Sequence, residues 1–374
     1  MTAKVDIAVI GAGVVGCAIA RHFKIKHPNF SVVVFEKAEG VGLETSRLNS
    51  GVIHSGIHEN PDFLKSKLAL IGSKMAVEFA ADNDVPIINC GMLVVAGHKS
   101  LIGGMLKEWR SFVRLVSKAK AKGINYRFVW GRRGIRKLEP RVQALGGVFM
   151  PDVCVVDPYD FTKKLFADAW GRGVHFQFGN PVEKIERLED CWQLGGAVAS
   201  CRAKIVINAA GLYADDVAEM AGFTGYKIHP WRGEYYEVMG EKAKWINRLV
   251  YIATPPKSAG KGIHFGVKPG GKLFLGPSAR LVPAKNYYTE DPTPVEVFLD
   301  AAQRFCPEIR KEDLRWSHSG IRPRLTVGEQ EADFIIKLDS DSPPFVNLIG
   351  IESPGFTSGM AIAEYVENLV RDNF

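Results

Sequence analysis

Apolar positions along the chain follow two periodicities, one typical of helices and the other of strands. Apolar residues three and four positions apart predict helices at residues 64–83, 106–122, 135–140, 158–170, 213–221, 293–305 and 358–371. Short apolar runs predict strands at residues 7–10, 31–35, 86–96, 147–150, 174–178, 181–187, 192–194, 197–200, 204–208, 334–338 and 345–348. After residue 228 the pattern becomes β alternation, at residues 233–239, 249–253, 262–267 and 273–276, which predicts an antiparallel sheet.

A glycine-rich turn follows the first predicted strand. Gly11, Gly13 and Gly16 give the spacing G-x-G-x-x-G, in which the first glycine permits a tight turn. The second lets a pyrophosphate approach the backbone, and the third lets the next helix pack closely on the strand. Glu36 ends the second strand, near the distance expected for the acid that binds a ribose 2′-hydroxyl. Together these features predict a dinucleotide site, but they do not say which dinucleotide binds.

The order of the elements predicts a discontinuous architecture. Helices alternate with strands at the start, in the middle and at the end of the chain, and antiparallel strands lie between these parts. We therefore expect an α/β (α+β overall) fold with a Rossmann-like dinucleotide-binding domain built from residues 1–83, 147–222 and 318–374. A β-rich antiparallel substrate-binding domain would comprise residues 84–146 and 223–317.

Composition narrows the class of protein. The chain has 374 residues, 46% of them hydrophobic and 24% charged, which is typical of a globular protein large enough for two domains. The net charge is +7, but the Lys and Arg residues are spread along the chain rather than clustered. We therefore expect no nucleic-acid partner and a positive pocket for an anionic cofactor and substrate. Weak attraction to an acidic membrane surface is left open.

The cysteines and apolar segments indicate a reducing compartment. The six cysteines contain no C-x-x-C pair, which argues against a zinc site, an iron–sulfur cluster or a disulfide framework. No cleavable leader is expected before the first strand, and no apolar run approaches the roughly 18 residues needed to span a bilayer. We expect a cytoplasmic protein, with peripheral association at the inner membrane face left open.

Several motifs occur along nearly the whole chain. They are V-I-G-A-G-V-V-G at 9–16, E-K at 36–37, T-S-R-L-N-S-G-V-I-H-S-G at 45–56, V-I-N-A-A-G-L-Y-A-D at 206–215, W-R-G-E-Y-Y at 231–236, G-I-H-F at 262–265, L-G-P-S-A at 275–279, S-G-I-R-P at 319–323 and I-E-S-P-G-F-T-S at 351–358. In this order they resemble the FAD-dependent oxidoreductases of the D-amino-acid-oxidase superfamily. The N-S-G-V-I-H and R-G-E-Y-Y motifs most resemble the L-2-hydroxyglutarate dehydrogenases and oxidases.

The resemblance implies FAD as the cofactor. Residues 45–51 would run along the flavin, and the helix start at residues 355–358 would point N–H groups at its N1–C2=O edge. A helix N-terminus stabilises the negative charge of a reduced flavin. The resemblance implies these cofactor-binding residues: Gly11, Gly13, Gly16, Glu36, Lys37, Thr45, Ser46, Asn49, Ser50, Gly51, Val182, Ala210, Gly211, Arg322, Gly355, Phe356, Thr357 and Ser358.

Oxidation of a 2-hydroxy acid requires a grip on the carboxylate, a base for the hydroxyl proton and hydride transfer to flavin N5. Arg322 is the first candidate for the grip, because a planar guanidinium pairs with a carboxylate through two hydrogen bonds. His54 and His264 are the candidate bases, because imidazole accepts protons near neutral pH. His58, His229 and His318 are lesser candidates. A second substrate carboxylate would need Arg232 or Arg280, and Tyr235 could add a hydrogen bond.

Alternative functions remain open. An FAD-dependent oxidase of glycine or sarcosine would not need a histidine base, and a glycerol-3-phosphate dehydrogenase would suit the basic charge. A non-catalytic FAD protein that acts on tRNA or in assembly is a further alternative. The electron acceptor could be O2, a quinone or another flavoprotein. Residues 254–261 (T-P-P-K-S-A-G-K) depart from the hydroxyglutarate enzymes and are expected in the pocket wall, which leaves the exact substrate open.

Overall fold

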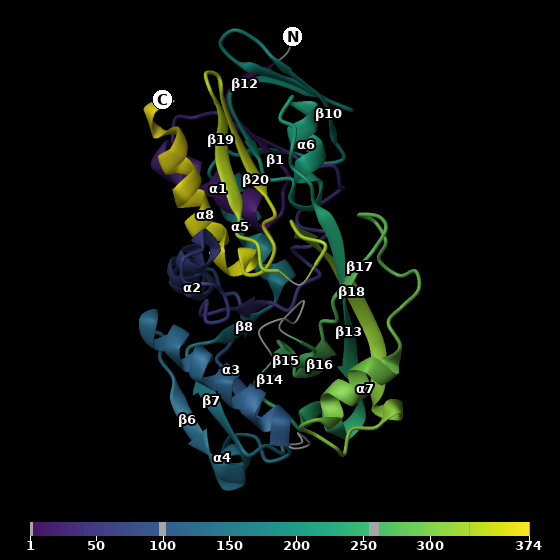
Figure 1. Cartoon of the computed structure of the whole chain (residues 1–374). Coiled ribbons are helices and arrows are strands. Elements are labelled where there is room, and N and C mark those ends of the chain that lie inside the picture. The colour runs from purple at the N-terminus through teal and green to yellow at the C-terminus, as the bar shows by residue number, and fades with distance from the viewer. Residues whose placement is uncertain (1–2, 97–101, 254–261, 329, 374) are drawn as a thin grey trace.

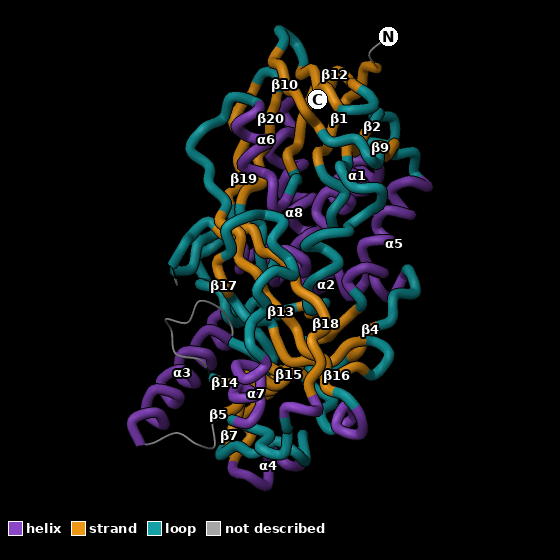
Figure 2. Tube along the Cα trace, turned by 90° about the vertical axis from the view of Figure 1, so that its right-hand side faces the viewer, coloured by secondary structure: helices purple, strands orange, loops and turns teal. Residues whose placement is uncertain are grey.

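The chain folds into two lobes, shown by a computed structural model that describes residues 3–96, 102–253, 262–328 and 330–373. One lobe carries both termini, at the top of Figure 1, and the other lies below it. A long ribbon formed by β13 (His229–Val238) and β18 (Leu314–Arg324) runs from the first lobe into the second (Figures 1 and 2).

The first lobe contains an eight-stranded mixed sheet in the order β10-β11-β12-β1-β2-β9, with β20 beside β12 and β19 beside β20. The strands are β1 (Ala3–Ile10), β2 (Val32–Phe35), β9 (His175–Gln177), β10 (Val182–Arg187), β11 (Trp192–Gly196), β12 (Ser200–Asn208), β19 (Ile335–Asp341) and β20 (Pro344–Ile349). Its centre, from β9 to β20, is parallel, which explains why the runs at its middle are apolar throughout. The G-x-G-x-x-G turn follows β1 at this centre.

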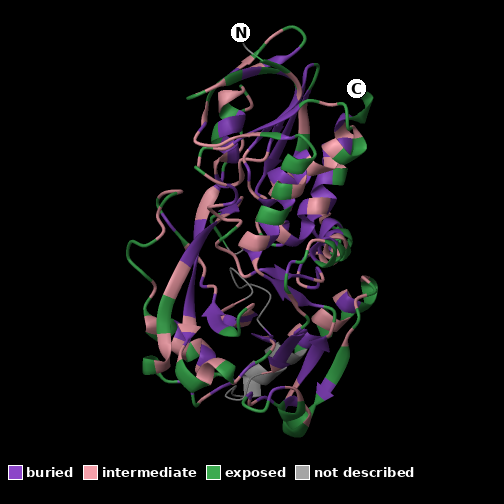
Figure 3. Cartoon of the chain, turned by 180° about the vertical axis from the view of Figure 1, so that it is seen from behind, coloured by how far each residue is buried: buried purple, intermediate pink, exposed green. Residues whose placement is uncertain are grey.

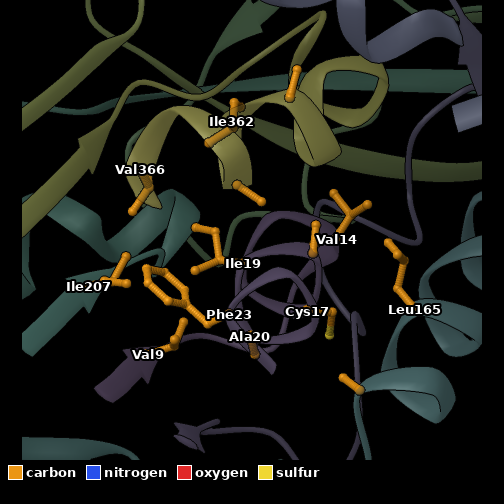
Figure 4. Packing of buried hydrophobic residues seen from close by; sticks show 14 of the residues in the cluster. Val9, Val14, Cys17, Ile19, Ala20, Phe23, Leu165, Ile207, Ile362 and Val366 are labelled. Atoms are coloured by element: carbon orange, nitrogen blue, oxygen red, sulfur yellow. The ribbon is translucent and has the colours of Figure 1, made fainter. Parts of the chain in front are cut away.

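Helices bury the sheet. They are α1 (Val14–Lys26), α2 (Leu64–Asp82), α5 (Pro158–Gly171), α6 (Ala214–Met220), which follows η1 (Gly211–Tyr213), and α8 (Gly355–Val370). Helix α1 packs between α5 and α8, and Figure 4 shows its residues Cys17, Ile19 and Phe23 in the shared core. A side chain at Gly16 would place its Cβ 1.9 Å from the carbonyl oxygen of Gly11, so only glycine allows this approach.

The second lobe is built on a nine-stranded sheet in the order β17-β13-β16-β15-β14-β5-β7-β6, with β18 beside β13. Its other strands are β5 (Met92–Ala96), β6 (Arg127–Trp130), β7 (Gly146–Met150), β14 (Leu249–Ile252), β15 (His264–Lys268), β16 (Lys272–Gly276) and β17 (Arg280–Leu281). Helices α3 (Ile102–Ala121), α4 (Gly131–Leu138) and α7 (Val295–Gln303) accompany it, with η2 (Gly240–Lys244) and η3 (Lys311–Asp313). Figure 3 shows buried residues in both lobes, with exposed ones on the outer helices.

A small three-stranded sheet completes the fold. It comprises β3 (Val52–Ile53), β8 (Cys154–Val156) and β4 (Ile87–Ile88), and the chain ends in η4 (Arg371–Asn373). Among the described residues no helix has the length and apolar character needed to cross a membrane.

Most predicted elements are present, and the differences have local causes. The run 86–96 is split into β4 and β5, because Gly91 takes φ 67° and lies where a Cβ would be 2.5 Å from the Phe149 ring. Only Ser200 of the run 197–200 lies in a strand: β12 starts there and continues through the run 204–208, while residues 197–199 form the turn between β11 and β12. Helix α8 starts at Gly355 rather than at residue 358.

The sheets divide the chain differently from the predicted domain boundaries at two places. Strand β7 pairs with β5 and β6, and β18 pairs with β13 along its whole length. Both strands therefore belong to the second sheet, although residues 147–150 and 318–324 were expected in the dinucleotide-binding domain. The reason is that a pairing partner far away in sequence decides which sheet a strand joins.

Candidate active site

A cavity of about 1170 Å³ extends between the two lobes. Its lining combines the glycine turn, the loop at residues 45–52, the start of α8, and side chains from β14, β15 and β18. Predicted cofactor residues that line it are Gly13, Thr45, Ser46, Asn49, Ser50, Gly211, Arg322, Gly355, Phe356 and Thr357. The cavity therefore joins most of the residues that sequence motifs had placed in widely separated segments.

The remaining predicted cofactor residues do not line the cavity. They are Gly11, Gly16, Glu36, Lys37, Gly51, Val182, Ala210 and Ser358. Lys37 pairs with Glu44 at 2.6 Å, and Val182 begins β10. Their predicted contacts with FAD remain predictions.

The glycine turn is held so that its backbone faces the cavity. Gly11 has φ +103°, and a Cβ there would lie 2.6 Å from the carbonyl oxygen of Ala209. At Gly13 a Cβ would lie 3.0 Å from the hydroxyl of Ser46, which accepts a 2.9 Å hydrogen bond from the backbone N–H of Val14. The N-terminus of α1 therefore opens onto the cavity with little side-chain bulk in front of it, as a pyrophosphate requires.

Glu36 braces this turn. Its carboxylate accepts hydrogen bonds from the backbone N–H of Ala12 at 2.7 Å and of Ala38 at 2.8 Å. Burial raises the pKa of Glu36, while these two bonds oppose the shift. Glu36 thus fixes the distance between the glycine turn and the end of β2.

The loop at residues 45–51 is tied to both lobes. The Thr45 hydroxyl donates a 2.9 Å hydrogen bond to the carbonyl of Ile321, on the strand that carries Arg322. Asn49 donates to the carbonyl of Ser46 at 2.7 Å and accepts from the N–H of Gly51 at 2.8 Å. The polar groups of this loop are therefore held in place before any ligand binds.

The first turn of α8 is joined to the segment that carries His54. The Thr357 hydroxyl accepts a 3.0 Å hydrogen bond from the backbone N–H of His54 and lies 3.2 Å from the carbonyl of Val52, to which it donates. The side chain of His54 is buried and lines the cavity. The predicted base is therefore positioned next to the helix start expected at the flavin.

Arg322, Tyr235 and Ser50 form a polar corner of the cavity. The Tyr235 hydroxyl lies beside Ser50 and Arg322, and burial raises its pKa while these two polar neighbours oppose the shift. Gly233 lies beneath the guanidinium, since a Cβ there would come within 3.3 Å of an Arg322 Nη atom. The geometry suits a cation that grips an anion with a phenol beside it.

His264 reaches the same corner through Tyr251. The two rings are stacked at 3.8 Å between centroids with an interplanar angle of 17°. The positive charge of Arg322 is close enough to Tyr251 to oppose the rise of the Tyr251 pKa. The Nδ1 atom of His264 lies 3.0 Å from the carbonyl of Gly262, which can only accept a hydrogen bond. The proton of the neutral imidazole therefore belongs on Nδ1, and Nε2 is the nitrogen that carries the lone pair.

Tyr251 was missed by the sequence reasoning. It lies in the run L-V-Y-I of β14, fully buried, and such a run is typical of core packing. Only its position in the fold, between His264 and His58 and on the cavity wall, shows its relation to the site. Burial raises the pKa of its hydroxyl well above the ordinary range, so Tyr251 stays neutral and can donate a hydrogen bond.

Two predicted substrate residues are placed differently. Arg232 does not line the cavity: it is fully buried and pairs with Glu234 at 2.9 Å. Its other donors bind carbonyl groups of residues 287–291. The substrate-binding role predicted for Arg232 is therefore not supported by its position. Arg280 lines the cavity and pairs with Asp291 at 2.8 Å.

Of the lesser histidine candidates, the structure places only one, His58, on the cavity wall. His58 lines the cavity beside Tyr251. His318 is stacked on Tyr235, and burial together with the charges of Lys268 and Arg47 lowers its pKa to about 3. His318 is therefore neutral and a weak base at physiological pH. His229 and His318 do not line the cavity, and residues 254–261, expected in its wall, lie outside the described part of the chain.

The fold and the cavity place this chain in the class of dinucleotide-dependent oxidoreductases. A profile of the family described as FAD dependent oxidoreductase (DAO) matches residues 6–369. The chain belongs to this family, and the cofactor is FAD. The glycine turn without side-chain bulk, the fixed loop and the two helix N-termini fit such a group.

Known proteins resemble the chain over nearly its whole length. A mitochondrial L-2-hydroxyglutarate dehydrogenase from Caenorhabditis elegans is 28% identical, with 99% of this chain and 94% of that protein aligned. A glycerol 3-phosphate dehydrogenase from Caloramator mitchellensis is also 28% identical, covering 98% of this chain and 74% of that protein. A structure of L-α-glycerophosphate oxidase from Mycoplasma pneumoniae with FAD bound superposes with a TM-score of 0.87 at 27% identity, covering 98% and 95% of the two chains.

Proposed function

We propose that this chain oxidises L-2-hydroxyglutarate to 2-oxoglutarate. The observation that carries the proposal is the polar corner in which Arg322, Tyr235, Tyr251 and His264 meet on one cavity wall. It contains a carboxylate grip, two neutral phenols and an imidazole with its lone pair on Nε2. The relatives named L-2-hydroxyglutarate dehydrogenase support the choice of substrate.

The 1-carboxylate of the substrate would bind Arg322. A guanidinium that forms two parallel hydrogen bonds fixes both the position and the orientation of a carboxylate. The Tyr235 hydroxyl already contacts Arg322 and is neutral, so it can donate to the same carboxylate. With the carboxylate fixed there, the C2 hydroxyl would point into the cavity that His54 and His264 also line.

A histidine would take the proton of the C2 hydroxyl. His264 Nε2 and the ring of His54 are the candidate acceptors, and both rings line the cavity. When bound, FAD supplies the acceptor for the C2 hydrogen and its two electrons. Removal of the hydroxyl proton raises the electron density on the oxygen, which favours departure of the C2 hydrogen and formation of the C=O bond.

A second carboxylate would need a second cation on the cavity wall. Arg280 remains a candidate, since it lines the cavity although Asp291 neutralises part of its charge. Arg114 of α3 also lines the cavity, is exposed, and has no described acidic partner. These two arginines would distinguish a dicarboxylate from a short monocarboxylate.

Glycerol 3-phosphate is a second candidate substrate. The observation in its favour is that relatives at 27–28% identity are named for this substrate and for L-α-glycerophosphate. It also carries a secondary alcohol beside an anionic group, which the same arginines could bind. The two substrates differ in that only hydroxyglutarate has a carboxylate attached to the reacting carbon.

A turnover assay with an artificial redox dye separates these functions. We expect the kcat/KM for L-2-hydroxyglutarate to exceed that for D-2-hydroxyglutarate, glycerol 3-phosphate, glycine and sarcosine by at least about a hundredfold. A higher kcat/KM for glycerol 3-phosphate would transfer the assignment to the second candidate. Turnover of glycine or sarcosine alone would contradict both.

A further inference from the structure

A cluster of exposed aromatic side chains lies at the free edge of the second sheet. Strand β6 pairs only with β7 among the described strands, and its residues Phe128 and Trp130 are 46% and 67% exposed. Their rings are stacked at 5.5 Å, and Tyr126 contacts Phe128 edge-on at 5.8 Å. Leu145, 42% exposed, directly precedes the residue that pairs with Trp130. Single exposed apolar residues are ordinary, whereas a contiguous patch marks an interaction surface.

Basic side chains border this patch, and the nearest acidic residue in sequence, Glu139, is buried and paired with Arg248. Basic residues are spread along most of the chain, but residues 126–138 are an exception with five cations and no acidic residue: Arg127, Arg132, Arg133, Arg136 and Lys137. The four on α4 are exposed, and within the part of the chain that the structure describes none of them forms an ion pair. Ile135, fully buried, anchors the other side of α4 to the sheet. The cations therefore face solvent beside the aromatic rings.

The patch lies at one end of the molecule. Figures 1 and 2 both show α4 at the bottom end, with the two chain termini at the opposite end. Among the described residues β6 makes its main contacts with β7 and α4, both of the second lobe. The surface made of Tyr126, Phe128, Trp130 and the four cations of α4 is called the β6–α4 face below.

We infer that the β6–α4 face binds the surface of an anionic phospholipid membrane. Trp and Tyr side chains prefer the depth of the lipid headgroups, where a ring is partly buried and its polar end is hydrated. Exposed Lys and Arg side chains next to them are attracted to phosphatidylserine or other acidic headgroups. A protein partner with an acidic, apolar surface would also cover the aromatic rings, but four exposed cations with no ion pair among the described residues favour a surface of uniform negative charge.

Vesicle sedimentation tests the inference with the FAD-loaded protein. We expect it to pellet with vesicles of phosphatidylcholine and phosphatidylserine at low salt, to be released at high salt, and not to pellet with phosphatidylcholine alone. Arg132→Gln with Arg133→Gln should weaken binding about 25-fold, at about fivefold for each charge removed. Trp130→Ser should weaken it by roughly tenfold or more.

Matched variants elsewhere on the surface serve as controls. Trp170 of α5 is 65% exposed, so Trp170→Ser removes an equally exposed tryptophan. Lys67→Gln with Lys74→Gln removes two exposed charges, without a described ion pair, from α2 in the first lobe. We expect both controls to bind vesicles as the unchanged protein does, and all variants to retain turnover.

Three results would overturn the inference. In the first, the unchanged protein does not bind vesicles. In the second, the control variants lose as much vesicle binding as the β6–α4 variants. In the third, the β6–α4 face joins two copies of this chain instead of binding lipid. The last would appear as a dimer in sedimentation that Trp130→Ser dissociates.

Discussion

The backbone N–H of His54 donates a 3.0 Å hydrogen bond to the hydroxyl of Thr357, in the first turn of α8. The same hydroxyl donates to the carbonyl of Val52 at 3.2 Å, so one side chain joins a candidate base to the helix start on the cavity. The position of His54 therefore depends on α8 as much as on its own loop.

Thr357→Val should separate the hydrogen bonds from the shape of the side chain. Valine keeps the volume, but it leaves a buried N–H and a buried carbonyl without this partner, at a cost of about 1–3 kcal/mol. We expect a lower thermal midpoint, and a kcat reduced by roughly tenfold if His54 moves. Thr357→Ser, which keeps the hydroxyl, is the control. Equal kcat for the valine and serine variants would show that this contact does not position His54.

His54→Gln and His264→Gln should identify the base. Loss of a general base costs roughly a hundredfold or more in kcat, and the dependence of kcat/KM on the ionisation of that base disappears. The variant that shows both effects marks the base. His318→Gln is the control, because burial, Lys268 and Arg47 keep the pKa of His318 at about 3, so it does not titrate near neutral pH. Unchanged activity in both His54→Gln and His264→Gln would exclude these two histidines as the base and leave His58, which also lines the cavity.

Arg322 and Arg232 should respond differently to the loss of their charge. Arg322→Met removes the proposed carboxylate grip, and we expect kcat/KM to fall by about a hundredfold with the fold retained. Arg232→Met leaves Glu234 buried without its partner, which should destabilise the protein by about 3–5 kcal/mol. The KM of the Arg232→Met protein for the substrate should change little. Steady-state kinetics and thermal unfolding of both variants check the contrast, and a raised KM in a folded Arg232→Met protein would restore Arg232 to the substrate site.

Lys268 should make stability depend on pH. Its side chain lies over the rings of Phe274 and Tyr235, and burial lowers its pKa to about 8. Between pH 8 and the ordinary lysine pKa the unfolded chain holds a proton that the folded chain has lost, so stability from this group rises with pH.

Lys268→Met should therefore stabilise the protein at pH 7 by about 2 kcal/mol, and the gain should shrink as the pH approaches 10. Unfolding measured at both pH values with FAD at fixed concentration checks this. Lys272→Met, at a side chain that is 59% exposed and pairs across the strands with Lys268, should have a smaller effect than Lys268→Met at pH 7. A gain that is the same at pH 7 and pH 10 would show that the charge of Lys268 is not the cause.

Much of the fold could be predicted because local patterns specify it. The helix predicted at residues 64–83 is α2, Leu64–Asp82, since its apolar spacing and its end both lie in the local sequence. Strand β6 was missed because only Val129 of its four residues faces inward, so an edge strand carries almost no burial pattern.

The site was harder to predict because it depends on contacts between distant segments. Motifs placed Arg322, His54 and His264 in the site, and all three line the cavity. Arg232 was predicted to bind substrate and Tyr251 was not singled out, because neither a buried ion pair with Glu234 nor a stack on His264 leaves a signal in the neighbouring residues.

Anaerobic titration of the FAD-loaded protein with L-2-hydroxyglutarate tests the central claim most directly. We expect the absorbance of oxidised FAD to bleach with one equivalent of substrate, with one equivalent of 2-oxoglutarate formed, and Arg322→Met to require far more substrate. An oxidised spectrum that stays unchanged with L-2-hydroxyglutarate, in a preparation that dithionite bleaches, would contradict the claim.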